Sequence, residues 1–152
     1  MPDSRALTVA VDAMGGDDGI ETAVGGAIAA LKQDRGLELD LVGDREQLER
    51  RFASVDSSLR SRLSVVAADS VLPMDVDTAS ALRRGRGSSM YETLDRVANG
   101  QADAAVSAGN TGALMALSRQ LLGMLPGIER PALMAAIPAA GHSVWVLDLG
   151  AN

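Results

Sequence analysis

The sequence predicts an α/β fold in which a mostly parallel sheet lies between two layers of helices. Short apolar segments rich in β-branched residues alternate along the chain with segments whose apolar residues recur at helical spacing. Glycine and polar residues mark most of the switches between the two patterns. No internal repeat, low-complexity tract or linker interrupts the series, so residues 1–152 are expected to form a single domain.

The first half of the chain contains three expected strands and two expected helices. The segment ALTVAVDA is a compact apolar run bounded by glycines, which suits a strand buried on both faces. The segment IETAVGGAIAALKQ places its apolar residues on one helical face. In order, we expect a strand at residues 6–13, a helix at 20–33, a strand at 37–43, a helix at 44–53 and a strand at 62–68.

The second half begins with an irregular stretch at residues 69–78 and then continues the alternation. The segment SSMYETLDRVANG carries the clearest helix signals, with Glu92 three residues after Ser89 as an expected capping box and Gly100 at its end. The remaining expected elements are a strand at 103–108, a helix at 111–123 and strands at 131–139 and 143–150. Parallel strands need such helical crossovers, which cover both faces of the sheet.

Composition excludes several classes of function. The net charge of −6 argues against nucleic-acid binding. The absence of cysteine removes thiol catalysis, cysteine-ligated zinc and disulfides. The amino-terminal segment lacks the pattern of a signal peptide, and the longest uncharged stretch, 131–147, is interrupted by Pro138 and Gly141 and is too short to span a bilayer. We therefore expect a cytoplasmic protein without a transmembrane helix.

Three polar turns follow expected strands: DAMGGDD, SAGNTG and DLGAN. Ligands of open parallel sheets bind at the carboxyl ends of strands, so these turns are the candidate site. In the second turn, Gly109 and Gly112 allow close approach of a ligand to a helix N-terminus, which attracts anions. The alternative is that Asn110 or Thr111 only caps the helix. In the first turn, Asp12, Asp17 and Asp18 could bind Mg²⁺, or two of them could be helix caps.

One local exception to the acidic character of the chain is the segment LRRGRGSSM at residues 82–90. Guanidinium groups bind phosphate through paired hydrogen bonds, and serine hydroxyls at a helix start would add donors. The arginines Arg83, Arg84 and Arg86, with Ser88 and Ser89, therefore form a candidate phosphate site. The alternative is a solvated basic turn.

Other known motifs fit poorly. The glycine spacing matches neither a Walker A loop nor a dinucleotide-binding turn. Asp75 and Asp77 resemble the carboxylate pair of haloacid-dehalogenase-type phosphatases, but that pair follows a buried strand, and Pro73 stands in this approach. His142 is the only histidine and no serine-elbow sequence accompanies it, so a structural or surface role is expected.

Five segments in the same order and at similar separations resemble the PlsX family of phosphate acyltransferases. They are VAVDAMGGD, LRRGRGSSM, VSAGNTGALMA, GIERPAL and LDLGAN. The resemblance extends over residues 7–152 and corresponds to about the amino-terminal half of a family member. Because Asn152 directly follows an expected strand, we also expect the chain to be a fragment.

The resemblance implies transfer of a fatty acyl group from acyl carrier protein to inorganic phosphate, which gives acyl phosphate for a glycerol-3-phosphate acyltransferase of phospholipid synthesis. It further implies a three-layer α/β/α architecture similar to isocitrate and isopropylmalate dehydrogenases, a homodimer, peripheral contact with the inner membrane surface, and neither a cofactor nor a metal. No individual catalytic residue is assigned. We expect the isolated 152-residue chain to lack acyl transfer.

By the match of motifs, two groups of residues are expected in the substrate and phosphate site. The first comprises Ser107, Gly109, Asn110, Thr111 and Gly112, with Arg86, Ser88 and Ser89 on the phosphate side. Asp12, Asp148 and Asn152 are expected to line the same crevice. Two alternatives remain open: a phosphate acetyltransferase-like enzyme that uses acyl-coenzyme A, and a truncated, non-catalytic binding module.

Overall fold

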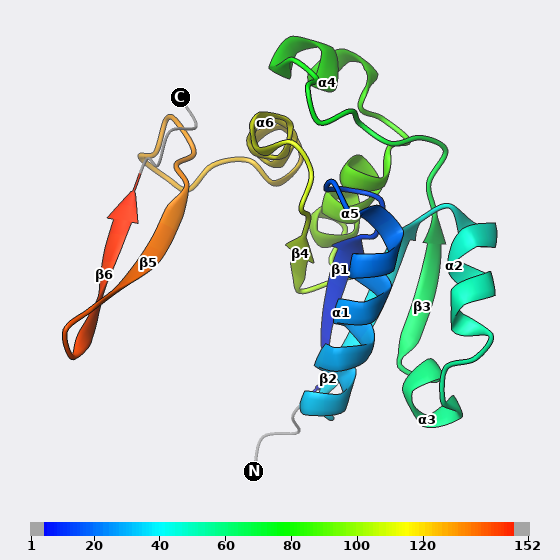
Figure 1. Cartoon of the computed structure of the whole chain (residues 1–152). Helices are drawn as coiled ribbons and strands as arrows, with labels where there is room; N and C mark the ends of the chain where they lie inside the picture. Colours follow the sequence, from blue (N-terminus) through cyan, green and yellow to red (C-terminus); the bar gives the residue numbers. More distant parts are fainter. Residues whose placement is uncertain (1–4, 148–152) are drawn as a thin grey trace.

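A four-stranded parallel sheet forms the centre of the molecule (Figure 1). The computed structural model describes residues 5–147. The strands are β1 (Leu7–Asp12), β2 (Leu37–Gly43), β3 (Leu63–Ala67) and β4 (Ala104–Val106), in the order β3-β2-β1-β4. Every neighbouring pair is parallel, so the carboxyl ends of all four strands lie at one edge of the sheet.

One face of the sheet is covered by α1 (Gly19–Gln33), α2 (Arg45–Phe52) and α3 (Ser57–Arg60). These helices and strands share one apolar core. Its buried residues are Ala13, Ile20, Val24, Ala27, Leu31, Leu39, Leu41, Leu48, Phe52 and Leu63. The spacing of Ile20, Val24, Ala27 and Leu31 is the helical period that predicted α1, so the apolar stripe of that helix faces the sheet.

The opposite face carries α5 (Ser89–Ala98), and α6 (Thr111–Leu122) and α4 (Thr78–Arg84) pack beyond it. A second, smaller core joins these helices through Ala81, Met90, Leu94, Ala113 and Leu117. The alternation of β2 accounts for the two layers: Leu39 and Leu41 enter the first core, whereas Asp40, between them, pairs with Arg96 of α5. The expected arrangement of helices on both faces of a parallel sheet is therefore confirmed.

Two short helices were not predicted. Both α3 and α4 begin at an aspartate whose side chain accepts a backbone hydrogen bond, from Ser58 for Asp56 and from Ser80 for Asp77. The helix α4 begins at Thr78, the last residue of the stretch that was expected to be irregular. It follows that the Asp-x-Asp sequence at 75–77 contributes a helix cap, because Asp77 is the N-cap of α4.

The last two strands depart from the prediction. Residues 131–150 were expected to add strands to a mostly parallel sheet, but β5 (Met134–Ala139) and β6 (His142–Leu147) form a separate antiparallel hairpin. Ala139 pairs with His142, and the two-residue turn between them places Gly141 at a φ of 78°. Figure 1 shows this hairpin standing apart from the sheet. Within residues 5–147, no helix is long and apolar enough to cross a membrane.

Candidate functional site

The carboxyl ends of β1 and β4 are joined by a short chain of hydrogen bonds around Asp12. This residue ends β1 and is only 4% exposed. Its Oδ1 accepts hydrogen bonds from the amides of Met14 at 3.2 Å and Gly15 at 3.1 Å. Its Oδ2 accepts one from the Ser107 hydroxyl at 2.7 Å, and the Ser107 oxygen accepts one from the Gly109 amide at 3.0 Å. The first and second predicted turns therefore form one connected structure.

The glycines of these turns lie at close backbone contacts. A Cβ added at Gly15 would lie 2.6 Å from the Asp12 Oδ2 and 2.9 Å from the Gly109 nitrogen. One added at Gly109 would lie 2.6 Å from the terminal methyl carbon of Met90, in the first turn of α5. The site thus brings the ends of β1 and β4 against the start of α5. Gly15 is required for this packing because an added Cβ would meet the Gly109 backbone, whereas at Gly109 the end of the flexible Met90 side chain would have to move.

The start of α6 combines a structural cap with free backbone donors. Asn110 is the N-cap: its Oδ1 accepts a hydrogen bond from the Ala113 amide at 2.8 Å, and its Nδ2 donates one to the Met74 carbonyl at 2.6 Å. Among the hydrogen bonds of residues 5–147, none uses the amides of Thr111 and Gly112. These two amides are consequently the available donors at the positive end of the helix.

The helix α5 does not begin with the capping box that was expected from Ser89 and Glu92. Ser88, in an extended conformation, is the N-cap and accepts a hydrogen bond from the Tyr91 amide, whereas Ser89 is the first helical residue. Glu92 is therefore one position too far along for the reciprocal bond of a capping box. Ser89 is 1% exposed, and its hydroxyl has no hydrogen-bond partner among the described residues. A buried hydroxyl without a partner is costly, which marks it as a position where a ligand could supply the missing bond.

Arg86 precedes this helix and is exposed. Burial raises the pKa of Glu92 above its usual value, and the nearby carboxylates Asp95 and Asp69 add to this rise. The positive charge of Arg86 and a hydrogen bond with the Gly87 backbone oppose it. Neither a hydrogen bond nor an ion pair of Arg86 occurs in the part of the chain that the structure describes. Its guanidinium is therefore available to an anion, in competition with Glu92.

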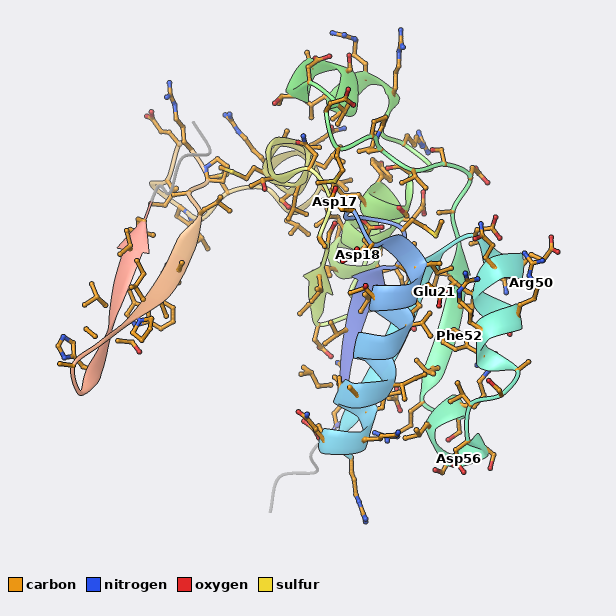
Figure 2. All side chains as sticks on the ribbon, in the orientation of Figure 1. Asp17, Asp18, Glu21, Arg50, Phe52 and Asp56 are labelled. Carbon is orange, nitrogen blue, oxygen red and sulfur yellow. The ribbon has the colours of Figure 1, made fainter. Side chains whose placement is uncertain are left out.

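Asp12, Asp17 and Asp18 do not form the magnesium site that was considered for the turn before α1. Asp17 and Asp18 are exposed at the beginning of the helix (Figure 2), and the Asp18 side chain makes no cap hydrogen bond. Across residues 5–147, no three acidic or histidine side chains are grouped so that they could hold a metal ion. A cavity of about 180 Å³ lies here instead, and Gly16, Gly19, Ser107 and other residues line it.

The structure thus joins Asp12, Ser107 and Gly109 directly and places Asn110, Thr111 and Gly112 in the same turn. Ser88 and Ser89 lie at the start of the adjacent helix α5, and Arg86 lies just before it. Asp148 and Asn152 fall outside the described residues. The single histidine, His142, is exposed in the hairpin and its Nδ1 lies 3.1 Å from the Ala140 carbonyl, in agreement with the expected surface role.

Two neighbours of the site were missed by the sequence. Thr78 of α4 lies close to Gly112, since a Cβ on that glycine would be 3.4 Å from the Thr78 hydroxyl oxygen. Met90 lies against Gly109. Thr78 had a usable signal, because it follows the cap Asp77 at a helix start. Met90 had none, because its contact depends on how α5 and α6 pack together.

Comparisons with known proteins identify the family. The model of the family described as "Fatty acid synthesis protein" matches residues 7–152. The chain is 47% identical over 149 residues to the phosphate acyltransferase of Aliivibrio fischeri (strain MJ11), and the match covers 97% of this chain and 44% of that protein. It is 49% identical over 147 residues to the phosphate acyltransferase of Photobacterium profundum, which covers 96% of this chain and 43% of that protein.

A third relative, the phosphate acyltransferase of Vibrio cholerae serotype O1 (strain ATCC 39315 / El Tor Inaba N16961), is 50% identical over 147 residues, again 96% of this chain and 43% of the relative. The chain therefore spans less than half the length of the curated relatives that it matches. The family match covers the joined turns of β1 and β4, both helix starts and the hairpin. The chain belongs to the PlsX family, described as fatty acid synthesis proteins.

Proposed function

We propose that this chain provides the phosphate-binding part of an enzyme that transfers a long acyl group from acyl carrier protein to inorganic phosphate. Family membership and three relatives named phosphate acyltransferase support the reaction class. The observation that carries the proposal is the buried connection from Asp12 through Ser107 to the Gly109 amide, which fixes two turns beside the unused amides of Thr111 and Gly112.

In the proposed site, phosphate accepts hydrogen bonds from the amides of Thr111 and Gly112 at the start of α6. Arg86, Ser88 and Ser89 contribute from the start of α5. The N-terminal end of a helix stabilises an anion by about 0.3–1 kcal/mol, and charge-assisted hydrogen bonds add to this. Asp12 acts as a positioning residue in this proposal, because it holds the Ser107 hydroxyl and through it the Gly109 amide.

The reaction requires a phosphate oxygen next to a thioester carbonyl carbon. Attack forms a carbon–oxygen bond and places negative charge on the former carbonyl oxygen; collapse of this intermediate breaks the carbon–sulfur bond and releases the carrier as a thiolate. The products are acyl phosphate and the free carrier thiol after protonation. Because phosphate is the nucleophile, the chain's contribution is to orient the dianion and to stabilise the developing charge with backbone donors.

The family resemblance also supports a proposal for the enzyme's location, its oligomeric state and the enzyme that uses its product. In that setting the enzyme is a cytoplasmic homodimer that contacts the inner membrane surface peripherally. A glycerol-3-phosphate acyltransferase consumes its product.

A phosphate titration tests the site. Isothermal titration calorimetry with inorganic phosphate would compare the wild-type chain with Arg86→Ala and Ser89→Ala. Loss of a charge-assisted hydrogen bond should weaken binding roughly tenfold for Arg86→Ala. Ser89→Ala should also weaken binding, yet its stability should equal or exceed that of wild type, because the Ser89 hydroxyl has no partner in the described part of the protein.

The matched control is Arg35→Ala. Arg35 is also an exposed arginine, and it lies in the turn between α1 and β2, at the opposite edge of the sheet. Its replacement should leave phosphate affinity unchanged. Equal phosphate affinity in wild type, Arg86→Ala and Ser89→Ala would overturn the proposed site.

A further inference from the structure

Thr78, the first residue of α4, lies beside the start of α6. A Cβ added at Gly112 would be 3.4 Å from the Thr78 hydroxyl oxygen. In a helix the Cα–Cβ bond tilts toward the N-terminus, so this oxygen lies on the side of Gly112 to which the free amides of α6 point. Thr78 and Gly112 also line the same cavity of about 770 Å³, which opens between α4, α6 and the segment that leads to β5. The hydroxyl and the Gly112 amide therefore lie near one another, beside the same open space.

The separation of these two groups suits a shared anion. A Cβ lies about 2.5 Å from the nitrogen of its own residue, so the Thr78 Oγ1 lies within about 6 Å of the Gly112 nitrogen. Phosphate presents several oxygens, and each accepts a hydrogen bond from a donor about 2.7–3.0 Å away. One ion can therefore accept hydrogen bonds from both groups through two different oxygens.

The Thr78 hydroxyl is available to such a ligand. The residue is exposed, and none of the hydrogen bonds within residues 5–147 uses its side chain. This side chain is not needed to begin the helix, because Asp77 is the N-cap of α4 and accepts a hydrogen bond from the Ser80 amide at 2.8 Å. A threonine hydroxyl has one hydrogen-bond donor, which an anion can use.

Two contacts hold the segment before α4 in place. The Asn110 Nδ2 donates a hydrogen bond to the Met74 carbonyl at 2.6 Å, which ties this segment to the N-cap of α6. Leu72 and Val76 of the same segment pack against the smaller core. Asn110 thus has two roles, since its Oδ1 caps α6 while its Nδ2 fixes the chain that leads to Thr78.

We propose that Thr78 is a further ligand of the phosphate ion and that Asn110 is the residue that positions it. This inference rests on the proposed function. In the complete site, phosphate contacts the starts of three helices: a hydroxyl from α4, two amides from α6, and the hydroxyl and guanidinium groups at α5. Asn110 does not touch the ion in this arrangement, because it acts by holding the segment that carries Thr78 against α6.

Calorimetric titration with inorganic phosphate tests the role of Thr78 as a ligand. Valine has nearly the shape and the helix propensity of threonine but lacks the hydroxyl, so Thr78→Val should weaken phosphate binding by roughly five- to tenfold. The free energy of unfolding should be unchanged, because the lost hydroxyl makes no hydrogen bond with any residue between 5 and 147. Thr78→Ser keeps the hydroxyl and should bind phosphate as wild type does.

The matched control is Ser57→Ala. Ser57 is also exposed, and it is the first residue of a short helix, α3, that follows a capping aspartate, Asp56. Because α3 covers the other face of the sheet, this replacement should leave phosphate affinity unchanged. Equal phosphate affinity in wild type and Thr78→Val would overturn the inference, and so would a loss in Thr78→Ser as large as that in Thr78→Val.

A double-mutant cycle tests the positioning role of Asn110. Asn110→Ser retains a good N-cap for α6 but removes the Nδ2 donor to the Met74 carbonyl. It should therefore weaken phosphate binding when Thr78 is present and have little further effect in the Thr78→Val background. Losses that add fully would show that the two residues act independently, and would overturn the positioning role.

Phosphate binding by the wild-type chain separates this inference from the proposed function. Failure of wild type to bind phosphate would contradict the proposed function itself. If wild type binds phosphate and Thr78→Val binds it equally well, the proposed function stands and only this inference is wrong.

Discussion

At the scale of single residues, the Asp12 carboxylate organises the edge of the sheet. It is buried, and its two oxygens accept hydrogen bonds from the Met14 and Gly15 amides and from the Ser107 hydroxyl. Met14 and Gly15 lie in the turn after β1, and Ser107 lies in the turn after β4. The Asp12 carboxylate therefore connects the two turns. The glycines beside it make room for this connection, because the added Cβ positions at Gly15 and Gly109 fall within 3 Å of neighbouring atoms.

Replacing Gly15 by alanine tests this packing. The new methyl group would lie 2.6 Å from the Asp12 Oδ2 and 2.9 Å from the Gly109 nitrogen, so the two turns must separate. We expect a loss of roughly 1–3 kcal/mol in the free energy of unfolding, as for other overpacked sites. Urea unfolding followed by circular dichroism measures this change.

The control is Gly25→Ala in the exposed middle of α1, where an added Cβ meets nothing within 4 Å. Alanine is a better helix former than glycine by about 0.8–1.0 kcal/mol, so this variant should be more stable than wild type. A Gly15→Ala protein as stable as wild type would show that the turns are not closely packed.

At the scale of elements, α5 is attached to the sheet by an ion pair as well as by its apolar face. The Arg96 Nε lies 2.7 Å from the Asp40 Oδ2, and the side chains are 23% and 7% exposed. Arg96→Ala would leave a nearly buried carboxylate without its partner, and we expect a loss of roughly 3 kcal/mol in urea unfolding.

Arg50→Ala is the matched control for that ion pair. Arg50 pairs with Glu46 at 3.6 Å on the exposed side of α2, where the side chains are 66% and 82% exposed. Exposed pairs contribute less than about 1 kcal/mol, so this variant should unfold near the wild-type urea concentration. Similar losses in the two variants would contradict the structural role assigned to Asp40 and Arg96.

The cap of α4 makes a pH-dependent contribution. Hydrogen bonds from Ser80 lower the pKa of Asp77 below its usual value of 3.8. The charged form is therefore favoured in the folded state, and its contribution is present above pH 3.8 and is lost as pH falls through the lower folded-state pKa. Asn accepts the same bond without a charge. The difference in urea midpoint between wild type and Asp77→Asn should shrink between neutral pH and about pH 3; a constant difference would contradict this account.

Most elements were predictable because their signals are local. The apolar stripe of α1 and the alternation of apolar and acidic residues in β2 can both be recognised within a short segment of the sequence. The cap of α5 was placed one residue too late because Ser88 and Ser89 are equally suitable caps, and the backbone conformation decides between them. The partners of β5 and β6 could not be predicted, since an apolar segment indicates a strand without indicating which strand lies beside it.

The whole molecule contains two kinds of sheet that differ in burial. The parallel sheet is covered by two cores, whereas Met134, Trp145 and Leu147 of the hairpin are 60%, 64% and 62% exposed. An isolated two-stranded hairpin is marginally stable in water. Hydrogen exchange measured by mass spectrometry should therefore show amides of β1 and β2 exchanging roughly 100-fold more slowly than those of β5 and β6. Equal protection of the two sheets would contradict this description.

The candidate site was predictable at the same scale, but only in outline. Parallel strands bring their carboxyl ends to one edge, so the turns after β1 and β4 were expected to meet, and Asp12, Ser107 and Gly109 do so. A cavity of about 770 Å³ between α4, α6 and the segment at Arg130 was not predicted, because these segments approach one another only in the folded chain. Local sequence identifies which residues could bind phosphate, while tertiary packing determines which ones meet.

The proposed function depends on phosphate binding at the start of α6, beside the joined turns. Amide nitrogen–proton correlation spectra of the labelled chain, recorded during titration with sodium phosphate at constant ionic strength, test it most directly. We expect the largest saturable shifts at Thr111 and Gly112, with smaller shifts at Ser89, and we expect Ser107→Ala to reduce them. Shifts that do not saturate, or that are centred on residues such as Lys32 and Arg35 at the opposite edge of the sheet, would contradict it.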